Sequence, residues 1–226
     1  MVKNLAERFA SVQNQVKLAA EKVGRDADEI KLVAVSKTHP PEILLEAIEI
    51  GANILGENKI QEAESKIEKI GRGRAEWHLI GHLQSNKARK AVKLFDWIHT
   101  LDSIELAERL ERICIEEKQA DLNVLIQVDI AKEATKSGVS ENDLPELIEY
   151  LKSCERLKLK GFMIIPPFFE DAETVRPYFK KLRELRDELL PSGGLSMGMS
   201  HDFEIAIEEG ATIIRVGTAI FGHREY

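Results

Sequence analysis

Residues 31–37, Lys31-Leu-Val-Ala-Val-Ser-Lys37, form an apolar, β-rich run that ends in a lysine. Similar short runs recur along the chain and alternate with stretches of helical period. The predicted strands are Lys31–Val35, Asn53–Leu55, Trp77–Ile80, Trp97–Thr100, Asn123–Val128, Leu159–Phe162, Leu195–Met197 and Thr212–Val216. Eight strands with helices between them predict an α/β fold, a (β/α)8 TIM barrel.

An extra helix precedes this repeating unit. Apolar residues recur at three- and four-residue steps over residues 3–23, and Gly24 is a suitable stop. We expect one domain over residues 1–226, with the helix in 1–24 and the barrel in 31–226, and the helix capping the barrel or packing on its outer wall. An open doubly wound sheet is the main rival, which the lack of GxGxxG after the first strand weakens.

Composition restricts the class of protein. The chain has 226 residues, 43% hydrophobic and 31% charged, with a net charge of −7, so it is globular and not a general nucleic-acid or anionic-membrane binder. It has no signal-peptide pattern and no run of about 18 apolar residues. With Cys114 and Cys154 far apart and expected to be reduced thiols, we expect a soluble cytoplasmic protein.

Polar residues gather where the predicted strands end. Active sites of a TIM barrel lie at the carboxyl ends of its strands, so a ring of polar side chains there predicts a site. The residues at these ends are Lys37, Glu57, Asn58, His82, His99, Thr100, Asp129, Met163, Met199, Ser200, Gly217 and Thr218.

Lys37 ends the first strand. A lysine at a barrel mouth is partly desolvated, which favours the neutral amine that attacks a carbonyl. Lys37 is therefore a candidate Schiff-base lysine. The alternative is an ordinary solvated lysine at a strand end.

Two loops near the end of the chain predict an anion site. Gly194-Leu-Ser-Met-Gly-Met-Ser200 precedes a predicted helix, whose N-terminus presents unpaired N–H groups. The alternative is that Ser200 only caps that helix. Arg215-Val-Gly-Thr218 ends the last strand. Phosphate sites in TIM barrels commonly use the loops after strands seven and eight, which favours phosphate.

A lysine beside a phosphate site suggests a phosphorylated aldehyde, either a sugar phosphate or pyridoxal 5′-phosphate (PLP). Arg215 would point into the barrel mouth, where it would face the pyridine nitrogen of PLP. Arginine cannot accept a proton, so that nitrogen would stay largely unprotonated and the ring would be a weaker electron sink. The alternative is that Arg215 pairs with a core carboxylate.

The chain resembles the PLP homeostasis family of the YggS/PROSC type. The motifs that carry the resemblance are Val35-Ser-Lys-Thr38, Gly56-Glu-Asn58 with Gln61-Glu62, Trp77-His-Leu-Ile-Gly81, Leu83-Gln-Ser-Asn-Lys87, Lys136-Ser-Gly138, Gly161-Phe-Met163, Leu195-Ser-Met-Gly-Met-Ser200 with Asp202, and Arg215-Val-Gly-Thr-Ala-Ile-Phe-Gly222. They run in family order from about Lys31 onward. The resemblance implies a single PLP-binding barrel similar to the N-terminal domain of alanine racemase.

The resemblance also implies a role for each matching residue. Lys37 would form the Schiff base with PLP, and Arg215 would face its pyridine nitrogen. The residues implied to hold the phosphate are Ser200, Gly217 and Thr218, and those implied to line the pocket are Asn58, His82 and Met163. Lys136 matches a second motif lysine that would influence PLP exchange. His82 departs from the family pattern, in which proline is common.

The same resemblance favours binding over turnover. Alanine racemase uses a lysine and, as second base, a tyrosine delivered with a separate C-terminal domain. Here Tyr150 and Tyr178 fall in predicted outer helices, and the chain ends at Tyr226, so a second base is not evident. We expect a non-enzymatic carrier that takes part in PLP and amino-acid homeostasis, a monomer that gives PLP to PLP-dependent apo-enzymes.

Two enzymatic alternatives stay open. A PLP-dependent amino-acid racemase of low activity would use Lys37 with water, His82 or His201 as second base. A Schiff-base aldolase would act on a sugar phosphate and would carry no PLP chromophore.

Other motifs predict no further chemistry. His78 and His82 lie on a strand and its loop rather than on one helix, so a zinc site is not expected. The basic run Lys87-Ala-Arg-Lys90 predicts the solvated start of a helix. We therefore expect no metal and no nucleic-acid partner.

Overall fold

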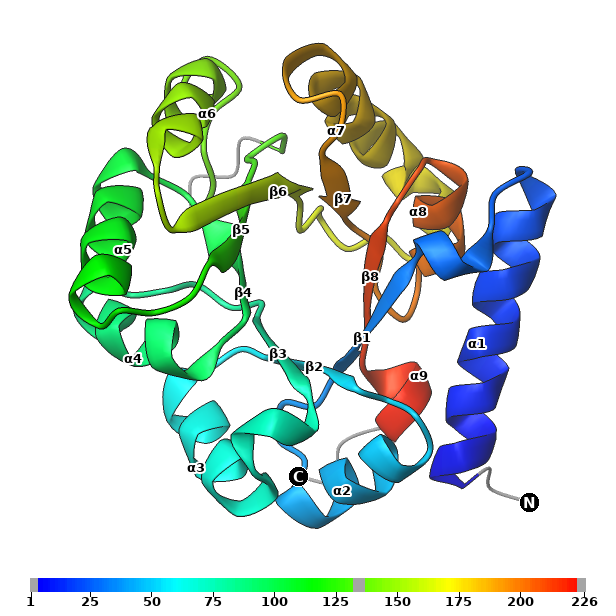
Figure 1. Cartoon of the computed structure of the whole chain (residues 1–226). Helices are drawn as coiled ribbons and strands as arrows, with labels where there is room; N and C mark the ends of the chain where they lie inside the picture. The colour runs from blue at the N-terminus through cyan, green and yellow to red at the C-terminus, as the bar shows by residue number, and fades with distance from the viewer. Residues whose placement is uncertain (1–3, 132–136, 223–226) are drawn as a thin grey trace.

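The computed structural model describes residues 4–131 and 137–222. In this part of the chain, eight parallel strands close into a barrel in chain order, surrounded by helices (Figure 1). The strands are β1 (Lys31–Val35), β2 (Ile54–Glu57), β3 (Glu76–Leu79), β4 (Trp97–Leu101), β5 (Leu122–Gln127), β6 (Leu157–Met163), β7 (Gly194–Ser196) and β8 (Ile213–Val216). The TIM barrel is confirmed, and the open sheet is wrong because β1 pairs with β8.

The helices fill the connections between the strands. The α-helices are α1 (Leu5–Lys22), α2 (Pro41–Glu49), α3 (Ile60–Ile70), α4 (Ala88–Leu94), α5 (Ile104–Glu116), α6 (Leu144–Ser153), α7 (Arg176–Leu189), α8 (Phe203–Glu208) and α9 (Thr218–Phe221). The short 3-10 helices are η1 (Ala27–Glu29), η2 (Arg72–Arg74), η3 (Ser85–Lys87) and η4 (Ala172–Val175). In the described ranges, no helix is long and apolar enough to cross a membrane.

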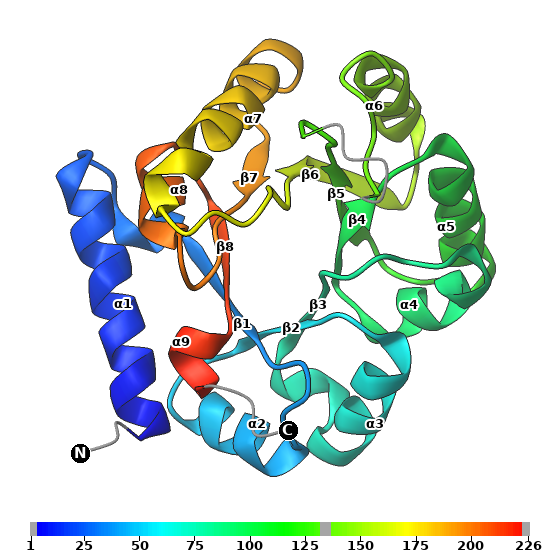
Figure 2. The same ribbon diagram turned by 180° about the vertical axis from the view of Figure 1, so that it is seen from behind.

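The N-terminal helix α1 packs on the outer wall of the barrel. It begins with a capping box, in which Asn4 Oδ1 accepts from Glu7 N at 2.8 Å and Glu7 Oε2 accepts from Asn4 N at 3.0 Å. Its apolar stripe, which includes Phe9 and Val12, is buried. Figures 1 and 2 both place α1 beside α8 and α9. Arg8 Nε donates to the Ile220 carbonyl at 2.6 Å, which links α1 to α9.

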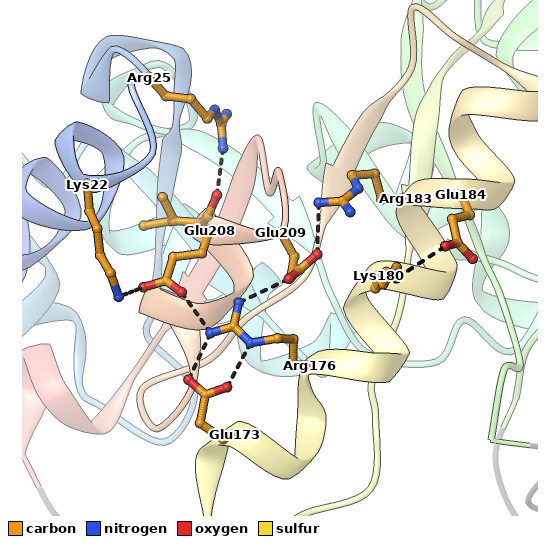
Figure 3. Close-up of polar contacts among 10 residues, drawn as sticks. Lys22, Arg25, Glu173, Arg176, Lys180, Arg183, Glu184, Glu208 and Glu209 are labelled. Carbon is orange, nitrogen blue, oxygen red and sulfur yellow. Dashed lines mark hydrogen bonds and ion pairs between the residues drawn. The ribbon is translucent and has the colours of Figure 1, made fainter.

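An ion-pair network joins α1, η4, α7 and α8 (Figure 3). The Arg176 guanidinium lies 2.7 Å from Glu173 Oε2, 2.7 Å from Glu208 Oε2 and 3.0 Å from Glu209 Oε1. Lys22 at the end of α1 lies 2.5 Å from Glu208 Oε1. These contacts hold α8, the helix that follows one of the predicted anion-binding loops.

Side chains of the strands alternate between two apolar layers. One layer lies between the sheet and the helices. The other lies inside the barrel, where a buried cluster contains Val33, Trp97, Leu125, Met163 and Ile213. This interior cluster fills part of the barrel interior.

Candidate functional site

A cavity of about 440 Å³ opens at the carboxyl ends of the strands, a size within the range of small-molecule sites. The structure brings six of the predicted site residues into its lining. They are Lys37, Asn58, Ser200, Arg215, Gly217 and Thr218. The cavity lining therefore contains residues from the end of the first strand and from the loops after the last two strands, which barrel closure brings together.

Lys37 follows β1 and is half-buried at the cavity. The backbone on both sides of it is held by α3. The Ser36 carbonyl accepts a hydrogen bond from Lys66 Nζ at 2.8 Å, and the Thr38 N–H donates to Glu62 Oε1 at 2.5 Å. Thr38 has a φ of 70°, which a non-glycine residue adopts only at a cost. These contacts fix the direction in which Lys37 leaves the strand.

The group behind Lys37 is a buried ionic cluster. Lys66 Nζ lies 2.6 Å from Glu57 Oε1 and 2.6 Å from Glu62 Oε1, and Ser36 Oγ donates to Glu57 Oε1 at 2.6 Å. Burial raises the pKa of Glu57 despite the nearby ammonium group. Burial also opposes ionisation of Glu62, but hydrogen bonds from Lys66 and Thr38 outweigh it and lower the pKa of Glu62. Sequence reasoning did not find this role for Lys66, although its i,i+4 spacing from Glu62 was a signal.

The anion-binding loops meet through Ser200. Its Oγ accepts hydrogen bonds from the Gly217 N–H at 3.1 Å and the Ala219 N–H at 3.3 Å. Ser200 therefore does not cap the helix that follows it, since the N-cap residue of α8 is Asp202. Ser200 instead links the loop after β7 to the first turn of α9, and its hydroxyl lies beside Thr218.

The loop before Ser200 has little room for side chains. Gly198 has a φ of 90°, and a Cβ there would lie 2.5 Å from Ala206 Cβ and 2.9 Å from Phe203 Cα. Asp202 Oδ1 accepts from the Met199 N–H at 2.6 Å. Backbone packing on α8 thus sets the path of the loop and, with it, the position of Ser200.

Arg215 lies on β8 with only 3% of its surface exposed. Its Nη1 donates to Ser196 Oγ at 2.7 Å and its Nη2 to the Ile164 carbonyl at 2.8 Å. Burial lowers the pKa of Arg215 to about 10, with the charge of Asp202 acting against the shift. The guanidinium is still charged at neutral pH, and both of these hydrogen-bond partners are neutral rather than carboxylates.

Asn58 follows β2 and approaches the loop after β3. A Cβ on Gly81 would lie 2.3 Å from the Asn58 carbonyl oxygen and 2.8 Å from its Cα. The close approach of these two backbones requires glycine at position 81 and holds Asn58 at the cavity.

Two of the predicted pocket residues lie outside the cavity lining. Met163 is fully buried in the interior cluster, because its side chain points into the barrel below the mouth. The His82 side chain is 55% exposed, and its Nδ1 lies 3.1 Å from Ser137 Oγ and 3.5 Å from Asp102 Oδ2. Lys136 lies outside the described residues.

The rim of the cavity contains aromatic groups of which only His201 was predicted, as a candidate second base. Phe168 is 78% exposed, and its ring lies 5.5 Å from that of His201, centroid to centroid. Both residues line the cavity, as does His39. Phe168, His201 and His39 follow the ends of β6, β7 and β1, so their positions could have been used to predict them from the sequence. Among the described residues, no group of three or more His, Cys, Asp and Glu side chains is arranged to hold a metal ion.

Together these features define a TIM barrel with a lysine after strand one and an anion site after strands seven and eight. The sequence profile of the family described as alanine racemase, N-terminal domain, matches residues 9–225. A curated pyridoxal phosphate homeostasis protein from Aquifex aeolicus is 45% identical over 230 residues, covering 99% of this chain and 100% of the relative.

Solved structures give the same result. PipY of Synechococcus elongatus, solved without PLP, has a TM-score of 0.85 and 39% identity, and the match covers 97% of this chain and 100% of PipY. The PipY structure with PLP bound has a TM-score of 0.83 and 38% identity at the same coverage. The chain belongs to the alanine racemase N-terminal domain family and, within it, to the group of pyridoxal phosphate homeostasis proteins, which confirms the resemblance drawn from the motifs.

Proposed function

We propose that this protein binds PLP in the cavity at the barrel mouth and takes part in intracellular PLP and amino-acid homeostasis without catalytic turnover. The observation that carries the proposal is the meeting of Lys37 with the Ser200–Gly217 anion loops in one cavity. The PLP-bound structure of PipY and the name of the Aquifex aeolicus relative support it.

The cavity fits the phosphate of PLP. Ser200 and Thr218 bring hydroxyl groups, and Gly217 has no side chain to keep a ligand from its backbone. The positive charge of Arg215 offsets phosphate charge. Hydroxyl donors beside a glycine, in a cavity that also holds a positive charge, suit a phosphate monoester better than a neutral ligand.

The remaining walls fit an aromatic aldehyde. Val35 and Ile80 provide apolar surface, and Lys37 lies beside them. When bound, the cofactor supplies an aldehyde that condenses reversibly with a primary amine. Lys37 is the amine that would hold it, as a Schiff base, while Asn58 contacts the ligand from the β2 side.

Arg215 favours storage over turnover. We assign Arg215 to the pyridine nitrogen of PLP, to which a guanidinium can only donate a hydrogen bond. A ring nitrogen that stays unprotonated withdraws electrons weakly, which disfavours carbanion chemistry. Arg215 would therefore orient the ligand without activating it.

The positions of the tyrosines also argue against two-base chemistry. Among the described residues, Tyr150 lies on α6 and Tyr178 on α7, and neither lines the cavity. Burial raises the pKa of Tyr150 to about 12, so its hydroxyl stays protonated at neutral pH. Tyr226 lies outside the described residues.

One observation favours a second function, an amino-acid racemase of low activity. His201 lines the cavity with Lys37, and its Nε2 lies 3.1 Å from the Glu170 carbonyl. Because a carbonyl only accepts, the neutral ring carries its proton on Nε2 and leaves Nδ1 as the acceptor. Exchange of the α-proton of an amino acid in D2O, lost in Lys37→Ala and in His201→Ala, would establish this function.

The binding proposal is tested by absorption spectra of the protein with added PLP, followed by borohydride reduction and mass mapping. We expect a band near about 420 nm and a phosphopyridoxyl group on Lys37, both lost in Lys37→Ala. Lys59→Ala, which removes an exposed lysine near the mouth, is the matched control and should behave as wild type. Absence of both band and adduct would reject PLP and favour a sugar phosphate.

The proposal extends to location and partners. Free Cys114 and Cys154 fit a reducing cytoplasm. We propose that the chain acts as a monomeric one-domain barrel that transfers PLP to PLP-dependent apo-enzymes. Mixing the loaded protein with an apo-aminotransferase, and comparing activation with that by free PLP in the presence of a PLP scavenger, tests the transfer.

A further inference from the structure

A line of polar side chains crosses the otherwise apolar barrel interior to the cavity. Glu76 Oε1 lies 2.7 Å from His78 Nε2, and His78 Nδ1 lies 2.8 Å from His99 Nε2. His99 Nδ1 lies 2.9 Å from Ser196 Oγ, which accepts from Arg215 Nη1 at 2.7 Å. We call these five residues the interior line. They come from β3, β4, β7 and β8, so the line exists only in the closed barrel.

The two ends of the interior line carry opposite charges. Glu76 lies at the amino-terminal mouth with 35% of its side chain exposed, and Lys31 Nζ donates to it at 3.0 Å. The hydrogen bond from His78 lowers the pKa of Glu76 to about 2, with Lys31 adding to the effect and burial opposing it. Arg215 at the cavity remains a guanidinium. The line thus joins a carboxylate to a cation.

The histidines between these charges are neutral and fully buried. Burial lowers the pKa of His78, and burial, with the charge of Arg215 adding to it, places the pKa of His99 well below its usual value. A neutral imidazole carries one N–H, so each ring donates once and accepts once.

These constraints leave one arrangement of protons. Because the Glu76 carboxylate only accepts, His78 carries its proton on Nε2 and accepts at Nδ1. His99 must then donate from Nε2 and accept at Nδ1, which makes the Ser196 hydroxyl its donor. Ser196 Oγ accepts from Arg215 in turn. Every hydrogen bond therefore points from Arg215 toward Glu76.

We infer that the interior line is a positioning device for Arg215, which fixes the direction of its guanidinium and so sets how the cavity holds the ring of its ligand. The inference rests on the proposed function for the identity of that ligand. His78, His99 and Ser196 act through Arg215 and are positioning residues. The line does not conduct protons to the ligand, because a guanidinium does not release its proton at neutral pH.

Ser196→Ala removes the contact between the line and Arg215. In ligand-free wild type, two-bond ¹H–¹⁵N spectra should show His78 and His99 as Nε2–H tautomers, and the Arg215 side-chain ¹⁵N signals should show restricted rotation. In Ser196→Ala the Arg215 signals should average, and the Kd for PLP should rise about five- to tenfold. Leu125→Met, a volume-conserving change in the interior cluster, should leave both readouts unchanged.

A charge swap at the opposite mouth tests the direction of the line without touching the cavity. Lys31→Glu combined with Glu76→Lys keeps the net charge but places a donor-only group beside His78. His78 must then accept at Nε2, so both histidines should change to the Nδ1–H tautomer, and the Kd for PLP should change by about twofold or more.

The outcomes separate the inference from the proposed function. If Ser196→Ala leaves the Arg215 signals or the Kd unchanged, or if Leu125→Met weakens binding equally, the inference is overturned. Histidines that keep the Nε2–H tautomer in the charge swap also contradict it. If wild type does not bind PLP but the ligand-free signals behave as expected, the proposed function fails and the positioning of Arg215 stands.

Discussion

The ammonium group of Lys66 lies 2.6 Å from Glu57 Oε1, and both side chains are at least 95% buried. The same ammonium group donates to the Ser36 carbonyl, one residue before Lys37. An ion pair on the outer side of the barrel thus holds the backbone from which Lys37 extends toward the cavity.

Lys66→Met should destabilise the fold by about 3 to 5 kcal/mol, because it leaves the Glu57 carboxylate buried without its cation. Urea unfolding measures the change. The control Lys90→Met breaks the exposed pair with Glu64 and should cost at most about 1 kcal/mol. The double variant Lys66→Met with Glu57→Leu should recover most of the loss, and its failure to do so would contradict an uncompensated charge as the cause.

Gly198→Ala should displace the loop that carries Ser200, since its Cβ would meet Ala206 at 2.5 Å on a backbone with positive φ. We expect a lower melting temperature and a Kd for PLP raised at least about tenfold. Gly73→Ala is the matched control, because a Cβ there has no atom within 4 Å. Equal effects of the two variants would argue against loop displacement.

Ser200→Ala should weaken PLP binding by about tenfold, because it removes a hydroxyl from the phosphate site and the acceptor that holds the start of α9. Binding of pyridoxal, which has no phosphate, should change little. Isothermal titration with both ligands checks this difference, with Ser153→Ala on α6 as control. Equal losses for the two ligands would move Ser200 out of the phosphate site.

The free energy of unfolding should fall as the pH drops from about 7 to 5. Burial lowers the pKa of His78 and His99, so in this range these two histidines take up more protons in the unfolded chain than in the folded chain. Each histidine removes up to about 1.4 kcal/mol per pH unit below its unfolded pKa of about 6.5. Urea unfolding at several pH values measures the slope. His82→Asn, at an exposed site, should keep this slope, and His99→Gln should reduce it.

Arg176→Ala should lower stability by about 1 to 2 kcal/mol, more at low salt than at high salt, because three carboxylates share its guanidinium (Figure 3). Thermal melts at low and high salt measure the effect. Lys180→Ala, which breaks an exposed pair with Glu184 on α7, is the control and should change little. A loss that does not depend on salt would point to packing of the arginine stem instead.

The barrel could be predicted because β-branched runs recur at a regular interval and helices separate them. The position of the site followed from one rule, that the carboxyl ends of parallel strands share a rim. Strand-end positions alone were enough to predict that Lys37, Ser200 and Arg215 lie together. The helix α3 was predicted only as one of the helices between the strands, because its lysines and glutamates hide a short apolar stripe.

The side-chain positions that could not be predicted from the sequence depend on strand register and on closure of the barrel. Whether Met163 faces the mouth or the layer beneath it is set by its depth in the barrel, which the motif does not encode. His82 lies outside the cavity lining, where it contacts Ser137 and Asp102 from other loops. His78 and His99 meet only once β3 and β4 pair and the barrel is complete.

The bond from Arg8 to the Ile220 carbonyl has a consequence for synthesis on the ribosome. The helix α1 emerges early, but it packs mainly on α8 and α9, which emerge near the end of the described chain, and to a smaller extent on η1 and α2. Until then α1 lacks most of its native partners, and β1 cannot pair with β8 to close the sheet. The barrel therefore cannot close before translation has reached the last strand, and a nascent chain halted before it leaves apolar surface of α1 and an open edge of β1 exposed.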